Sequence, residues 1–142
     1  MAEYSLALNE NWDLCLDAFG NIATCNEDDA ICQDVACALR LFTKDSYFDP
    51  QKGIPYFDIA LGKRPFESLV RSELTKTAKG VYGVIDAAIT HYEVTKNREL
   101  SLSMDCLVRS GRIKHIELSN MPTTKGQWWL LLILQQASML AQ

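Results

Sequence analysis

The chain has 142 residues, which is the size of one ordinary domain. Apolar residues make up 48% and charged residues 23%, a balance that excludes a disordered, collagenous or coiled-coil chain. The net charge of −4 is divided unevenly: residues 1–39 hold eight acids and no Lys or Arg, whereas residues 40–142 hold ten acids and fourteen bases. The chain is therefore not a uniformly basic nucleic-acid binder, and it has an acidic and a basic part to present to neighbours.

Neither a secretory leader nor a membrane span is expected. Residues 1–5 lack the basic and apolar regions of a signal peptide. The longest apolar run, residues 128–134, is far shorter than the roughly 20 residues that cross a bilayer. The five cysteines form no CxxC pair, which favours small buried apolar side chains in a reducing compartment over disulfides or a zinc site.

The N-terminal part is expected to be a hairpin followed by a helix. Residues 12–16 alternate between apolar and polar side chains, as in a half-buried strand, and residues 22–24 can form the return strand. A helix capped by Asn26 or Asp28 follows, since nearby acids suit the positive end of its dipole, and it ends near Thr43. Its apolar stripe consists of Ile31, Val35, Leu39 and Phe42.

The middle of the chain predicts a loop and two more helices. Residues 44–63 contain helix-breaking Pro and Gly but also many large apolar side chains, so this loop packs on the body or binds a partner. Pro65 suits the first turn of a second helix. The buried side of that helix is expected to hold Phe66, Leu69, Val70 and Leu74. A third helix is expected over residues 81–92, with the stripe Val81, Ile85, Ala88, Ile89 and Tyr92.

After residue 97 the pattern changes to strict alternation. Residues 100–108 and 113–118 predict two strands, joined by a two-residue turn at Ser110 and Gly111. Because helices and strands are segregated, the expected fold class is α+β: a small antiparallel sheet, made of the N-terminal and C-terminal hairpins, packed with about three helices. The sheet is expected to break at residues 120–122.

Two parts of the chain are distinguished. Residues 1–119 are expected to form a single domain. Residues 120–142 are expected to be an apolar tail that binds a partner, since a terminal segment apolar on all sides fits a groove on another chain. Trp128 and Trp129 are the sharpest interaction signal in the sequence, because aromatic anchors dominate interface energies.

Catalytic chemistry has little support in the sequence. GxSxG, P-loop and HExxH patterns are absent. His91, expected at a helix end, and His115, expected on the polar face of a strand, are interpreted as ordinary surface residues. Glu93 stands apart at the junction of the third helix with the sheet, but nothing around it indicates the apolar pocket that raises a carboxyl pKa. We therefore predict no enzymatic activity, no cofactor and no metal site.

The order of several short motifs is similar to that of a known family. DAFGN at residues 17–21 is followed by QDV at 33–35, LRLFT at 39–43 and DPQKGIPY at 49–56. Two expected helices and a polar acid–arginine junction then lead into paired strands. In order and spacing, over roughly residues 10–118, these motifs resemble the baseplate wedge proteins that initiate the tail sheath of contractile-tailed phages and related injection machines.

This resemblance implies a structural role. Family members lie around the tail tube, bind other wedge proteins, and offer a template to the first ring of sheath subunits. Sheath neighbours lend strands to one another's sheets, so an exposed sheet edge is the expected tool. The implied setting is the tail baseplate of a virion, assembled in the host cytoplasm from several copies around the tail axis. No nucleic acid is expected as a partner.

The resemblance also suggests residues for partner binding. The family carries Glu-Pro-Arg at the helix-to-strand junction. Here Glu93 and Arg98 supply the acid and the base, with longer spacing and no proline between them. The predicted partner-binding set consists of Glu93, Arg98, Trp128, Trp129, Leu131 and Ile133.

Two other interpretations stay open at this point. Some family members are labelled lysozyme-like, and a tail-associated peptidoglycan hydrolase requires two carboxyl groups that face each other across a cleft. A cytoplasmic adaptor unrelated to phages would share the Trp-rich tail but not the ring assembly. The uneven charge is interpreted as complementarity between neighbours in a ring, or toward the sheath.

Overall fold

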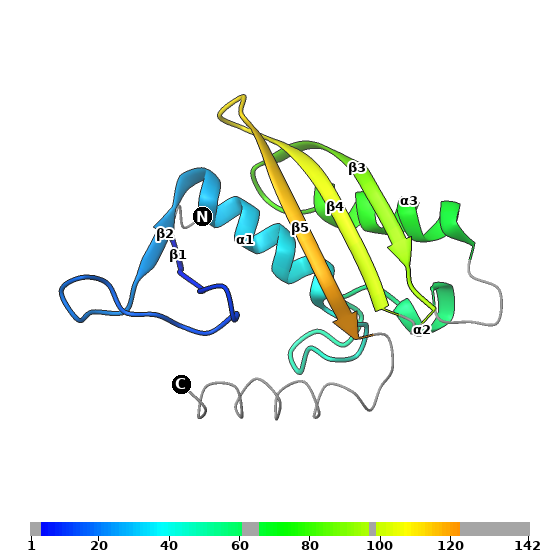
Figure 1. Ribbon diagram of the computed structural model, residues 1–142, viewed down its shortest axis with the longest axis horizontal. Coiled ribbons are helices and arrows are strands. Elements are labelled where there is room, and N and C mark those ends of the chain that lie inside the picture. The colour runs from blue at the N-terminus through cyan, green and yellow to red at the C-terminus, as the bar shows by residue number, and fades with distance from the viewer. Residues whose placement is uncertain (1–3, 61–65, 97–98, 123–142) are drawn as a thin grey trace.

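The computed structural model describes residues 4–60, 66–96 and 99–122. They form an α+β fold, as the sequence predicts, but the N-terminal and C-terminal strands lie in two separate antiparallel sheets rather than in one (Figure 1). In chain order the elements are β1 (Tyr4–Leu6), β2 (Thr24–Asn26), α1 (Glu27–Arg40), α2 (Tyr56–Ile59), α3 (Glu67–Lys79), β3 (Val84–Val94), β4 (Glu99–Val108) and β5 (Ile113–Pro122). Within this part of the chain, no helix is long and apolar enough to cross a membrane.

The core lies between a three-stranded antiparallel sheet and two helices. The sheet has the order β3-β4-β5, and α1 and α3 cover one of its faces (Figure 1). The central strand β4 alternates strictly between buried and half-buried residues. Its buried side chains are each at most 2% exposed and comprise Leu100, Leu102, Met104, Cys106 and Val108. The predicted alternation of this strand is thus confirmed, and its other face is left without a helical cover.

Helix α1 supplies the opposite wall of the core. Its first turn holds three acids, Glu27 to Asp29, which suit the positive end of the helix dipole. The predicted stripe of Ile31, Val35 and Leu39 is buried. Asn26 is the N-cap residue, but its side chain makes no capping hydrogen bond. The helix ends at Arg40, earlier than predicted, because Phe42 instead pairs as a strand residue with Ile54.

The predicted third helix is wrong, because residues 84–94 form the edge strand β3. Gly83 has a φ of +93°, which ends the preceding turn in a conformation that a helix does not use. The β-branched Ile85, Ile89 and Thr90 favour a strand, and pairing with β4 along the whole length of β3 stabilises it. The apolar residues whose spacing suggests a helix are distributed over both faces of this strand.

Three smaller predictions also differ from the structure. In α3 the predicted burial of Val70 and Leu74 is confirmed, whereas Phe66 and Leu69 are exposed and Ala78 is buried in addition. The β4–β5 turn has three residues rather than two, because the Val108 amide donates to the Arg112 carbonyl. β5 also does not break at residue 120. It continues to Pro122, at the end of an edge strand, where the missing amide is tolerated.

The N-terminal segment is more elaborate than a single hairpin. Residues 4–26, here called the N-terminal meander, run through three extended passes. β1 pairs with β2, and isolated bridges join Leu8 to Leu14 and Leu16 to Ile22. The predicted pairing of residues 12–16 with 22–24 is therefore confirmed in part, and the pairing of β1 with β2 was not anticipated.

The loop after α1 packs partly on the body. Ile54 and Tyr56 are buried, and the Tyr56 hydroxyl donates to the Leu39 carbonyl. Gly53 has a φ of +114°, and a Cβ there would lie 2.6 Å from the backbone of Phe42, so only glycine fits this crossing.

We expect Leu39→Ala to lower the free energy of unfolding by about 2–5 kcal/mol, because the side chain is fully buried in the wall of the core. Urea denaturation followed by circular dichroism measures this. Leu14→Ala is the matched control, since Leu14 is 57% exposed, and should change the value by less than about 0.5 kcal/mol. Equal losses for the two variants would contradict the assignment of the core to α1 and the sheet.

Candidate protein-binding interface

The two outer strands of the sheet, β3 and β5, are the first candidates for partner binding, since an edge strand offers unpaired backbone groups. The pairing of β3 with β4 is interrupted by register shifts after Val84 and after Ile89. Such bulges twist an edge strand, and a further strand then pairs with it less readily. β5 pairs with β4 in unbroken register over residues 113–118, and its one register shift comes after Leu118. The more regular free edge is therefore that of β5.

The hydrogen-bond pattern shows which backbone groups of β5 point outward. The Val108 amide donates to the Arg112 carbonyl at 3.0 Å. In an antiparallel ladder, hydrogen-bonded pairs alternate with pairs whose backbone groups point away from the partner strand. Counting from this first bond, the outward amide and carbonyl groups are those of Ile113, His115 and Glu117.

The face of the sheet that α1 and α3 leave uncovered is polar. Its side chains include both histidines of the chain, each beside a carboxylate. His115 Nδ1 lies 2.6 Å from Asp105 Oδ1, and His91 Nε2 lies 3.6 Å from Glu93 Oε2. The surface position predicted for His115 is confirmed. The predicted helix-end position of His91 is wrong, since His91 lies on β3.

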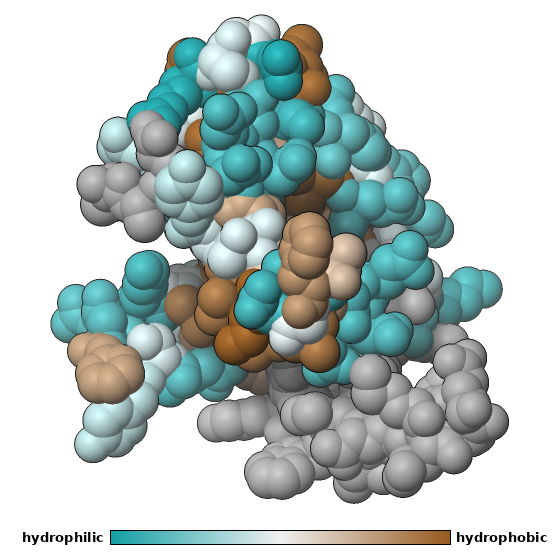
Figure 2. All heavy atoms as spheres, turned by 90° about the vertical axis from the view of Figure 1, so that its left-hand side faces the viewer, coloured by the Kyte–Doolittle hydropathy of each residue, from teal (hydrophilic) through white to brown (hydrophobic). Residues whose placement is uncertain are grey.

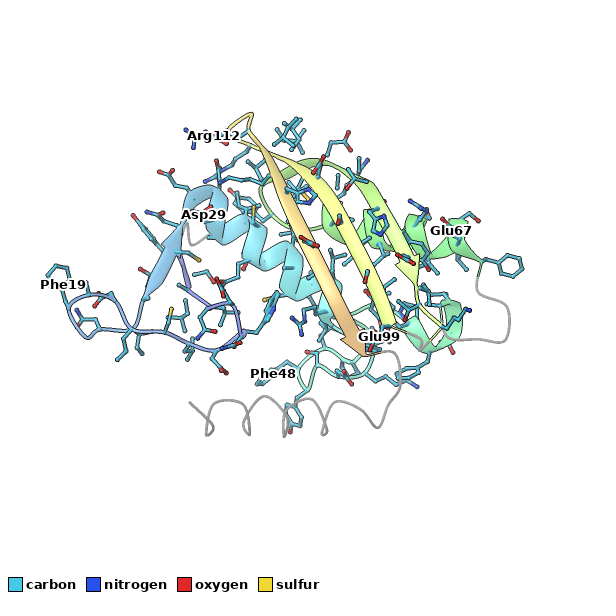
Figure 3. The ribbon with its side chains drawn as sticks, in the orientation of Figure 1. Phe19, Asp29, Phe48, Glu67, Glu99 and Arg112 are labelled. Atoms are coloured by element: carbon cyan, nitrogen blue, oxygen red, sulfur yellow. The ribbon has the colours of Figure 1, made fainter. Side chains whose placement is uncertain are left out.

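An acid–base clamp ties the start of α1 to the β4–β5 turn, which Figure 3 shows at one end of the molecule near Asp29 and Arg112. Asp28, which is buried, accepts a hydrogen bond from the Ser110 hydroxyl at 2.8 Å and lies 3.7 Å from the Arg112 guanidinium. Lys114 Nζ lies 3.0 Å from Asp29 Oδ1, and this contact raises the pKa of Lys114 above its ordinary value. Part of the charge asymmetry of the sequence is therefore used inside the fold.

Only one of the predicted partner-binding residues lies within the described part of the chain. Glu93 is on β3, with its side chain 63% exposed on the open face. Arg98 falls in the undescribed residues 97–98, so the pairing of Glu93 with Arg98 is not tested. The rest of the set, Trp128, Trp129, Leu131 and Ile133, also falls outside the described residues.

The structure offers little to a hydrolase in the residues that it describes. The shallow hollow beside α3 is lined by serine, threonine, lysine and arginine side chains and by Gly80, with no carboxylate among them. Glu93 lies on an open strand face beside a histidine rather than across a cleft from a second acid. In residues 4–60, 66–96 and 99–122, no group of three or more His, Cys, Asp and Glu side chains is arranged to hold a metal ion.

The cysteines are all free thiols. Cys106 is buried, and burial raises the pKa of its thiol to about 11, so it packs as an unreactive apolar side chain. Cys37 is exposed, and the other three are half-buried. The prediction of buried cysteines is therefore confirmed for Cys106 and wrong for Cys37.

Two groups of large apolar side chains are exposed. Tyr47 and Phe48 lie in the loop that the sequence predicts to pack on the body or bind a partner; they are 91% and 95% exposed and contact each other edge to face, with ring centroids 5.4 Å apart. The second group is on the N-terminal meander, and we call it the outer face of the meander: Tyr4, Leu6, Leu14, Leu16 and Ile22. Figure 2 shows apolar side chains gathered on this side of the molecule. Alternation in the sequence marks such a face, but it does not reveal which of the two faces points to solvent.

These surfaces belong to a domain with free sheet edges and exposed apolar side chains. The sequence model of the contractile injection system sheath initiator family matches residues 4–111. The chain therefore belongs to this family and is a structural component of a contractile injection system baseplate. No curated protein matches the chain.

We expect Asp28→Ala to lower the free energy of unfolding by about 1–3 kcal/mol, because it removes a buried acceptor from Ser110 and Arg112. Asp29→Ala should cost less, since the side chain of Asp29 is 72% exposed and water screens its pair with Lys114. Thermal unfolding at low and high salt measures both. A larger loss for Asp29→Ala would contradict the role given to Asp28.

Proposed function

We propose that the chain starts sheath assembly in the tail baseplate of a contractile-tailed phage by pairing the edge of β5 with an extended strand of the first sheath subunit. The observation that carries this proposal is the unbroken register of residues 113–118 at a free sheet edge. An added strand would satisfy the outward backbone groups of Ile113, His115 and Glu117. Each such hydrogen bond contributes about 0.5–1.5 kcal/mol net.

The clamp at the start of α1 supports this use of β5. Lys114 and the β4–β5 turn are held to α1 through Asp29 and Asp28. The edge is therefore fixed in place before a partner strand arrives, and less conformational entropy is lost when that strand pairs. A pre-ordered edge is what a template for a first ring requires.

The other predicted partners belong to the same proposal. Trp128, Trp129, Leu131 and Ile133 provide apolar anchors within the assembly, where the neighbours are other wedge proteins and the tail tube. Glu93 on the open face of β3, together with Arg98, forms a polar contact with a wedge partner. Several copies surround the tail axis of the virion, and assembly takes place in the host cytoplasm. The role is structural, without catalysis.

The proposal predicts that Glu117→Pro blocks sheath assembly without unfolding the chain. Proline removes the amide of residue 117, which points away from β4, and so leaves the β4–β5 ladder intact. The variant replaces the natural chain during tail assembly, and electron microscopy counts the baseplates that carry sheath. We expect the sheathed fraction to fall at least about tenfold, as for the loss of about 1.4 kcal/mol or more.

Glu117→Ala is the matched control, because it removes the same side chain and keeps the amide. It should assemble sheath normally. Val94→Pro removes an amide near the outer edge of β3 and serves to identify the edge that is used. If Val94→Pro blocked sheath assembly and Glu117→Pro did not, the assignment to β5 would be wrong.

A further inference from the structure

The loop between α1 and α2 carries two aromatic side chains that face solvent almost entirely. Tyr47 is 91% and Phe48 95% exposed, and their rings meet edge to face with centroids 5.4 Å apart. We call these two residues the aromatic pair. Large aromatic side chains are the groups that most often anchor a protein contact, because each removes much apolar area from water when it is covered.

The loop that presents the aromatic pair is closed at its base by hydrogen bonds. The Thr43 amide donates to the Ile54 carbonyl at 3.1 Å, and the Lys44 amide donates to the Pro50 carbonyl at 3.0 Å. The Thr43 hydroxyl also donates to the Gly53 carbonyl at 3.1 Å. An ordered loop therefore holds the aromatic pair outside, and a segment that covers the pair does not have to order this backbone first.

The loop lies at the end of the molecule where β5 stops. α1 and β5 start together, since Lys114 Nζ lies 3.0 Å from Asp29 Oδ1, and both run toward the same end (Figure 1). The fourteen residues of α1 rise about 21 Å, and the strand from Lys114 to Pro122 rises about 27 Å. Figure 3 shows Phe48 at the same end as Glu99, which pairs with Pro122. The chain therefore leaves the sheet at the end where the aromatic pair is exposed.

The sequence that follows Pro122 matches the aromatic pair in chemistry. Residues 128–134 read WWLLLIL, and residues 126–142 contain no charged side chain. The loop over residues 43–53 holds two acids and two bases, so it has no net charge to attract a charged partner. Contact between the apolar run and the aromatic pair would remove the apolar area of both from water.

We propose that residues 128–134 pack on Tyr47 and Phe48 of the same chain before a baseplate partner is present. This goes beyond the proposed function, in which the same residues anchor wedge proteins in the finished assembly. The six Cα steps from Pro122 to Trp128 span at most about 20–22 Å. α1 lies one layer, about 10 Å, from the sheet, and the loop follows α1 directly. The connection thus spans about twice the spacing of that layer.

The covalent connection favours the chain's own loop over the loop of a second copy. A segment on a short linker meets its site at an effective concentration on the order of millimolar. A second copy at micromolar concentration competes poorly against it. The contact also covers a run of seven apolar residues that would otherwise be an exposed patch on the unassembled chain.

Fluorine NMR of the full-length chain labelled with fluorotryptophan tests the contact. Each of the three tryptophans gives its own signal, and the change of a signal between H2O and D2O measures the exposure of that ring to solvent. The loop variant carries Tyr47→Ser and Phe48→Ser. We expect it to lower the ratio of docked to free tail at least about tenfold, so the signals of Trp128 and Trp129 become those of exposed rings. An unchanged Trp12 signal shows that the fold is kept.

Phe19→Ser is the matched control, because Phe19 is an aromatic residue with a similar exposure of 89% in the N-terminal meander. It should leave the signals of both tail tryptophans unchanged. Tail signals that are the same in the natural chain and the loop variant would overturn the proposal. Tail signals that become exposed when the natural chain is diluted would also overturn it, because the cover would then be a second copy. A response to Leu14→Gln with Leu16→Gln, and none to the loop variant, would assign the tail to the outer face of the meander.

The result does not depend on the proposed sheath contact. Neither sheath subunits nor wedge proteins are present in the experiment. Glu117→Pro changes the free edge of β5 and leaves the aromatic pair intact, so it should not alter the signals of the tail tryptophans.

Discussion

The shared helix α1 is the constraint on which the rest of the structure depends. One side of it packs Val35 and Leu39 against the sheet, where both are fully buried. Gln33 holds the N-terminal meander, Asp28 at the first turn holds the β4–β5 turn, and Arg40 at the last turn lies 4.1 Å from the ring centroid of Trp12. One helix of fourteen residues thus positions two separate β units. Its contacts determine which of their faces are buried and which are free.

The free surfaces follow directly from this arrangement. Because α1 and α3 lie on the same side of the three-stranded sheet, the opposite face and the outer edges of β3 and β5 have no cover from the described part of the chain (Figure 1). The long regular edge of β5 suits a partner strand, and the exposed pair of Tyr47 and Phe48 suits an apolar segment. Because the chain belongs to the sheath initiator family, these surfaces lie on a structural component of a baseplate.

Several elements could be predicted from the sequence because local pattern and tertiary environment agree there. β4 alternates strictly, and its apolar residues are those that the helices cover; α1 has a single apolar stripe and an acidic first turn. β3 could not be predicted in the same way, since Ile85, Ile89 and Tyr92 also fit a helical period, and only pairing with β4 decides the outcome. The candidate site was less accessible still. Alternation shows that the meander has two faces, but the contacts of Gln33 with β1 and with Leu8 decide which face points outward.

In the mechanism that we propose, β5 presents a pre-ordered edge to the first sheath strand. Amide hydrogen exchange of the chain, measured with and without the sheath subunit of the same injection system, tests it most directly. We expect the outward amides of Ile113, His115 and Glu117 to exchange rapidly in the free chain and to become protected when the sheath subunit binds. Protection confined to β3, with the exchange of these three amides unchanged, would show that β5 is not the edge that the sheath uses.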